Sequence, residues 1–134
     1  MNVRREQGPG AGVGRNVLVV ALYVLAPSEA EGAARVLVVA PLQDTARVRA
    51  SERAAMVVDL LERRGARAEG RVGDSNPLQS IADALETFAA DEIVIAIPPH
   101  VPRRRADGLL EAARRRFALP VRRATAAEPL PYAA

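Results

Sequence analysis

Two long runs of aliphatic residues lie close together near the start of the chain, and they constrain its fold more than any other feature. The first, Val17 to Ala26, reads VLVVALYVLA, and the second, Val36 to Ala40, reads VLVVA. Apolar runs without polar alternation are typical of strands that are buried on both faces of a parallel sheet. The first run follows Arg4, Arg5 and Arg15, but it is too short to span a bilayer, and we favour a strand over a signal peptide.

Strand and helix patterns alternate through the rest of the chain. Strands are expected at Asn16 to Leu25, Arg35 to Ala40, Arg67 to Val72, Glu92 to Ile97 and Pro120 to Ala124. Helices or helical turns are expected at Ser28 to Ala33, Asp44 to Arg64, Pro77 to Ala89 and Arg104 to Phe117. Five strands joined by helical crossovers predict a three-layer α/β/α sandwich with a five-stranded parallel sheet.

The helices carry the signals that such a sandwich requires. Their apolar residues recur at helical spacing and predict faces packed on the sheet: Ala54, Val57, Val58 and Leu61, then Ile81, Leu85 and Phe88, then Leu110, Ala113 and Phe117. Asn76 is a candidate N-cap, with Pro77 in the first helical position and Gln79 placed to reach back to the cap. Gly65 is expected to end the preceding helix as a C-cap glycine.

The length of 134 residues favours a single domain. We expect an N-terminal tail over residues 1–15, one α/β domain over residues 16–124 and a C-terminal tail over residues 125–134. The glycines near the N-terminus precede the first strand, so they do not fit a dinucleotide-binding fingerprint. The chain has no cysteine, which suits a reducing compartment, and we expect a cytoplasmic location.

The segment from Gly73 to Val121 carries a family resemblance. It combines a glycine that closes the third strand, a helix beginning at Pro77, a strand that enters as Asp-Glu-Ile-Val-Ile, and a last helix that leads into Leu119-Pro120-Val121. This order resembles the second half of a universal stress protein domain. The resemblance implies a Rossmann-like sheet with strand order 3-2-1-4-5, a homodimer, and a stress-response or regulatory role.

Many universal stress proteins bind ATP through a glycine-rich motif after the fourth strand, and this chain departs from that motif. Its loop reads Pro98-Pro99-His100-Val101-Pro102 before three arginines. Between Ile97 and the end of the last helix, Gly108 is the only glycine. Prolines remove the amides that would wrap phosphates. We therefore expect no cofactor of the family type, with ATP or another phosphate ligand as the alternative.

The same loop supplies the candidate site. If it lies at the carboxyl ends of the strands, Pro98, His100, Arg103, Arg104 and Arg105 would form an anion-binding loop, in which guanidinium groups and a helix N-terminus replace the glycine amides. No catalytic residues are expected, because no nucleophile and base pair is visible. No metal site is expected, because His100 is the only histidine and cysteine is absent.

Charge is distributed unevenly along the chain, although the net charge is only +3. Residues 74–92 hold five acidic residues and no arginine, whereas residues 103–123 hold eight arginines. This asymmetry suggests an anionic ligand or an acidic partner. Arg114 to Arg116, Arg122 and Arg123 are expected to face solvent, and the charges of the last strand would protect the edge through which family members often dimerise.

Three functions follow from these observations. The leading hypothesis is a non-enzymatic universal stress protein-like module, a homodimer with a diverged ligand pocket. The second is a nucleotide- or phosphate-binding protein that uses the arginine-rich loop. The third is a nucleic-acid-associated protein, and the scarcity of aromatic residues argues against it. We expect no membrane association.

Overall fold

The computed structural model describes residues 15–24, 32–43 and 47–124 of the chain. Its strands are β2 (Asn16–Ala21), β3 (Arg35–Pro41), β4 (Arg67–Gly73), β5 (Glu92–Ala96) and β6 (Val121–Arg123). Its helices are α1 (Arg47–Glu62), α2 (Pro77–Leu85) and α3 (Arg103–Arg116). The expected C-terminal tail at 125–134 and residues 1–14 of the N-terminal tail expected at 1–15 lie outside the described residues. Arg15 belongs to the described part, and its carbonyl accepts a hydrogen bond from the Ala34 amide at 2.8 Å.

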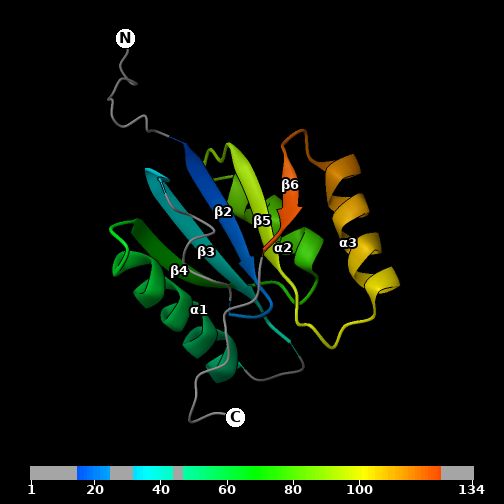
Figure 1. The fold of residues 1–134 in the computed structure, drawn as a ribbon, viewed down its shortest axis with the longest axis horizontal. Coiled ribbons are helices and arrows are strands. Elements are labelled where there is room, and N and C mark those ends of the chain that lie inside the picture. The colour runs from blue at the N-terminus through cyan, green and yellow to red at the C-terminus, as the bar shows by residue number, and fades with distance from the viewer. Residues whose placement is uncertain (1–14, 25–31, 44–46, 125–134) are drawn as a thin grey trace.

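The strands form one parallel sheet in the order β4-β3-β2-β5-β6. This order confirms the predicted 3-2-1-4-5 arrangement and places the fold in the Rossmann-like α/β class. The strands run from the top to the bottom of Figure 1, so their carboxyl ends lie together at the lower edge of the sheet, beside the first turns of α1 and α3. Neighbouring parallel strands require crossover connections, which are usually helices.

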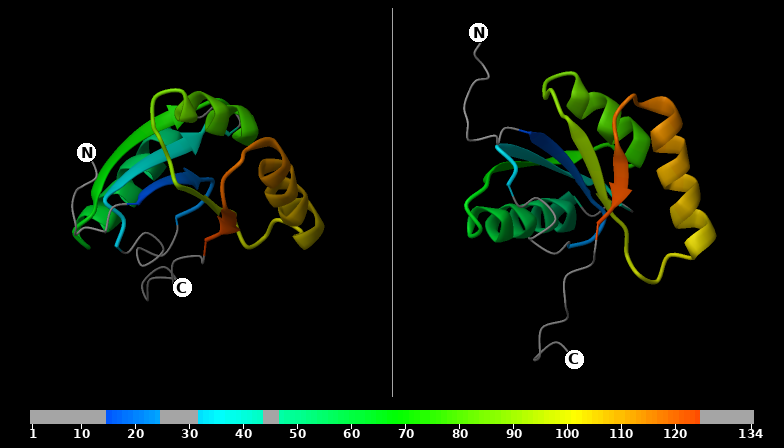
Figure 2. Two further views of the ribbon diagram at one scale, coloured as in Figure 1. Left: turned by 90° about the horizontal axis from the view of Figure 1, so that it is seen from above. Right: turned by 45° about the horizontal axis from the view of Figure 1, so that its top comes forward.

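The central strands β2, β3 and β5 are buried on both faces, as the two aliphatic runs predict for β2 and β3. One face packs against α1 through Val17, Val19, Val36 and Val38, and these four side chains are at most 2% exposed. The other face packs against α2 and α3, and the views in Figure 2 show these helices on the side of the sheet away from α1. Alternate residues of each strand enter opposite cores, because successive side chains of a strand point to opposite faces.

Most expected elements are present, but several boundaries were wrong. β2 ends at Ala21 rather than Leu25, because its neighbours end there: its pairing with β5 stops at Ala96, and the Leu22 amide donates to the Ala96 carbonyl at 3.2 Å. α2 ends at Leu85 rather than Ala89, because the amides of Glu86 and Thr87 donate to the carbonyls three residues earlier in place of four. Of the short helix or turn expected at 28–33, residues 28–31 lie outside the described part, Gly32 lies in a turn, and Ala33 is not helical.

The predicted helix ends are largely confirmed. The Asn76 side chain accepts hydrogen bonds from the amides of Leu78 and Gln79, at 2.9 and 3.4 Å, with Pro77 in the first turn. The Gln79 side chain does not reach back to the cap; it donates to Asp83 one turn later, at 2.8 Å. A C-cap glycine follows α1, since Gly65 has a φ of 92°. Within the described residues, no helix has the length and apolar character needed to cross a membrane.

Candidate functional site

A cavity of about 650 Å³ opens at the carboxyl ends of β2 and β5. The chain leaves β2 toward β3 on one side and leaves β5 toward β6 on the other, so this edge is the topological switch point of the sheet. Open α/β sheets bind ligands in the crevice at such a point. The described lining consists of Leu22, Tyr23, Val24, Gln43, Arg53, Ser75, Pro77, Ile97, Pro98, His100, Val101, Arg105, Ala106 and Leu109.

The walls of this cavity are mainly apolar. Leu22 and Val24 come from the segment after β2, Ile97 and Val101 come from the segment after β5, and Leu109 comes from α3. Polar side chains interrupt this wall at a few points. A concave site with an apolar wall and a few convergent polar groups is typical of small-molecule sites in proteins, and its volume lies in their usual range.

Arg53 of α1 joins the carboxyl ends of the two strands beside the cavity. Its Nε donates to the Ala21 carbonyl at 2.6 Å and its Nη2 donates to the Pro41 carbonyl at 2.8 Å. These carbonyls belong to the last residues of β2 and β3, after which the chain leaves the sheet. The guanidinium therefore holds the two strand ends together and adds a positive charge to the cavity wall. The sequence analysis did not predict this role of Arg53. The only signal in the sequence was the position of Arg53 next to the apolar stripe that begins at Ala54.

The proline-containing loop forms the opposite side of the cavity. Pro98 is buried, and its carbonyl accepts a hydrogen bond from the Val101 amide at 3.1 Å, which makes a tight turn around Pro99 and His100. Pro102 precedes α3 in an extended conformation, and no side chain caps this helix. The first turn of α3 contains no acidic residue. The positive end of the helix dipole is therefore not offset by a carboxylate in that turn.

The structure brings together part of the predicted anion loop. Pro98, His100 and Arg105 line the cavity. Arg103 and Arg104 are not among its lining residues; the Arg103 side chain is 91% exposed and lies 4.0 Å from Asp107 on the same helix. Successive helical residues differ by about 100° in direction, so three adjacent arginines cannot all face one cavity.

The acidic residue after β4 has a structural role. The Asp74 side chain accepts from the Asn76 amide at 2.8 Å, and its backbone carbonyl accepts from the buried Ser80 hydroxyl at 2.6 Å. These bonds fix the turn that places Ser75 and Pro77 at the cavity. The described residues contain no group of three or more histidine, cysteine or acidic residues that could hold a metal ion.

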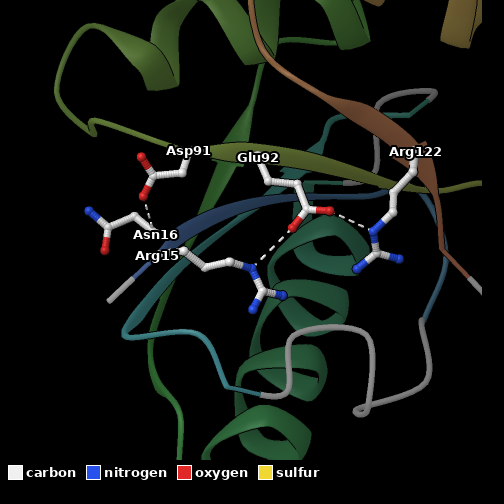
Figure 3. A network of polar contacts seen from close by, with 5 residues as sticks. All are labelled: Arg15, Asn16, Asp91, Glu92 and Arg122. Carbon is white, nitrogen blue, oxygen red and sulfur yellow. Dashed lines mark hydrogen bonds and ion pairs between the residues drawn. The ribbon is translucent and has the colours of Figure 1, made fainter. Parts of the chain in front are cut away.

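Part of the charge asymmetry of the sequence is neutralised within the fold, at the amino-terminal side of the sheet (Figure 3). Glu92 of β5 lies between two arginines: its Oε2 is 2.6 Å from the Arg122 Nε, and its Oε1 is 3.3 Å from the Arg15 Nε. The carboxylate is only 17% exposed. Beside it, the Asn16 amide donates to Asp91 at 2.7 Å, which ties the start of β2 to the start of β5.

The sequence predicts that Arg122 faces solvent, and this is wrong. Strand pairing sets its guanidinium beside the Glu92 carboxylate. Arg123 is exposed, and its Nη2 donates to the Ile97 carbonyl at 3.4 Å. Arg114 is exposed as expected but donates to the Val121 carbonyl at 3.1 Å. A sequence count of arginines thus overstates the positive charge that a ligand or partner would meet.

No protein-family model and no curated protein sequence matches this chain. Its class therefore rests on the fold: a Rossmann-like α/β domain with an apolar crevice at the switch point. The relationship to universal stress proteins stays a prediction.

Proposed function

We propose that the protein is a non-enzymatic binding module whose switch-point cavity holds a small organic anion. The observation that carries this proposal is the composition of one cavity: apolar walls with Arg105 and the uncapped N-terminus of α3 on one side. The wall would stabilise an apolar ligand body by removing it from water. Arg105 would hold an acidic group through charge-assisted hydrogen bonds. A regulatory role, in stress response or elsewhere, is the kind of process such a module would serve.

The shape of the loop favours a carboxylate, sulfonate or monophosphate over the triphosphate of ATP. Prolines at 98, 99 and 102 supply no backbone N–H, and most of the described cavity lining is apolar. A triphosphate requires many donors around a highly charged chain. A single acidic group requires only one arginine and the helix N-terminus.

The test uses the fluorescent probe 8-anilinonaphthalene-1-sulfonate, which joins an aromatic body to one anionic group. Binding should be saturable at one site, with the dissociation constant measured by fluorescence and by calorimetry. Arg105→Ala should weaken binding at least about tenfold, because a hydrogen bond to a charged group contributes about 1.5–3 kcal/mol. Arg104→Ala is the matched control, since it removes the same charge from the neighbouring residue outside the cavity lining.

A nucleotide ligand is the second candidate, supported by the three arginines in the first turn of α3. Titration with ATP and with inorganic phosphate distinguishes the two candidates. ATP binding that is tighter than probe binding would support the second candidate and overturn the first. Equal loss of probe binding in Arg104→Ala and Arg105→Ala would show that general positive charge, and not the cavity, attracts the anion.

A further inference from the structure

The outer edge of β4 has the pattern of a self-pairing strand. β4 ends the sheet beside β3, and no strand among the described residues pairs with its other side. A groove of about 370 Å³ runs between this strand and α1. Its described lining consists of Ser51, Ala54, Ala55, Val58, Asp59, Glu62, Gly70, Arg71 and Val72.

The hydrogen bonds to β3 fix which backbone groups of β4 point outward. The Gly73 carbonyl accepts from the Leu42 amide at 3.1 Å, so Gly73 directs its groups toward β3. Alternate residues of a strand direct their N–H and C=O groups to the same side. Glu69 and Arg71 therefore also bond toward β3, whereas the residues between them direct their groups outward. The outward residues are Ala68, Gly70 and Val72.

The side chains of β4 alternate in the same way between its two faces. Ala68 and Val72 pack against the core under α1. Glu69 and Arg71 lie on the other face, with the Glu69 Oε2 3.9 Å from the Arg71 Nη2, and their side chains are 62% and 41% exposed. One residue of each charge thus flanks Gly70 on a single face of the edge.

We propose that a second copy of this chain extends the sheet by pairing its own β4 antiparallel to this edge, with Gly70 opposite Gly70 on the twofold axis. In this register every outward N–H and C=O of Ala68, Gly70 and Val72 meets a partner group. Glu69 of each copy faces Arg71 of the other, in a non-hydrogen-bonded pair, where opposing side chains are closest. Charge complementarity and backbone register therefore both favour a second copy of this chain as the partner of the β4 edge.

Neighbouring registers are less favourable. A pairing centred on Glu69 would also align the outward amides, but it would set this carboxylate against its own copy and Arg67 against Arg71. The opposite edge of the sheet offers less: β6 has only three residues, and a symmetric pairing about its middle would set Arg122 against itself.

The helix above β4 leaves room for this association. α1 packs over β3 and β4, and it comes so close at Gly70 that an added Cβ would lie 3.1 Å from Val58 and 3.3 Å from Ala54. A twofold axis through Gly70 and perpendicular to the sheet sets the two α1 helices side by side and antiparallel. The residues of α1 that line this groove include the small Ser51, Ala54 and Ala55 beside the larger Asp59 and Glu62. Small side chains at a helix contact permit an interaxial distance of about 8–10 Å.

Sedimentation velocity across a range of protein concentrations tests the proposal by charge reversal. Glu69→Arg and Arg71→Glu should each raise the dimer dissociation constant at least about tenfold, because each replaces two attractive cross-strand pairs with two repulsive ones. An equimolar mixture of the two variants should form a heterodimer, in which every facing pair is again of opposite charge. The double variant Glu69→Arg/Arg71→Glu should dimerise like the parent.

A second variant tests the backbone pairing. Ala68→Pro removes an outward N–H while leaving the ladder to β3 intact, so it should abolish dimerisation with an unchanged circular dichroism spectrum. A parent protein that is monomeric at all concentrations would overturn the proposal, as would a dimer that none of these substitutions weakens. The measurement needs no ligand, so its outcome is independent of the function proposed for the cavity.

Discussion

Replacing Arg53 with alanine tests whether one guanidinium holds together the two strand ends at the cavity. The substitution removes the donors to the Ala21 and Pro41 carbonyls, at 2.6 and 2.8 Å. Hydrogen bonds to charged groups contribute about 1.5–3 kcal/mol each. Because Arg53 is half-buried, water can partly replace the lost donors, and we expect a loss of about 2–4 kcal/mol in the free energy of unfolding.

Urea denaturation followed by circular dichroism measures this loss, with an unchanged m-value expected if the unfolding remains two-state. Arg49→Ala is the matched control: it makes the same change one turn earlier, at an exposed position, and should alter the free energy of unfolding by no more than about 0.5 kcal/mol. Arg53→Lys should fall between the two, since an ammonium cannot reproduce the planar fork of a guanidinium. A loss below about 1 kcal/mol in Arg53→Ala would refute the assigned role.

Two further predictions concern the core under α2. Gly73→Ala should lower the free energy of unfolding by about 1–3 kcal/mol, because the new Cβ would lie 2.5 Å from the Ser80 Oγ and 2.6 Å from the Val39 Cγ1. An unchanged melting temperature in calorimetry would show that β4 can shift to make room. Ile81→Ala should lower the free energy of unfolding by about 2–5 kcal/mol, because Ile81 is fully buried. Leu85→Ala should lower it clearly less, because Leu85 is only half-buried. Equal losses in urea denaturation would contradict this difference between the two positions of α2.

The sequence by itself determined the class of fold and most of the elements. The run of Val36 to Ala40 required a strand buried on both faces, and such strands need helices on each side of the sheet. Asn76 and Pro77 fixed the start of α2, because capping is a local interaction between neighbours in the chain. The strand boundaries depend on more than the local sequence: β2 ends where its pairing with β5 ends, and that is a property of the sheet.

Only the tertiary structure decided the site and the distribution of charge. The sequence placed an arginine-rich loop near the crevice, but the rotation of α3 selected Arg105 for the cavity and left Arg103 beside Asp107. Arg53 binds the Ala21 carbonyl, 32 residues away, and Glu92 binds Arg122, 30 residues away. Contacts between residues so distant in sequence depend on helix rotation and strand register, and local propensities do not determine either of these.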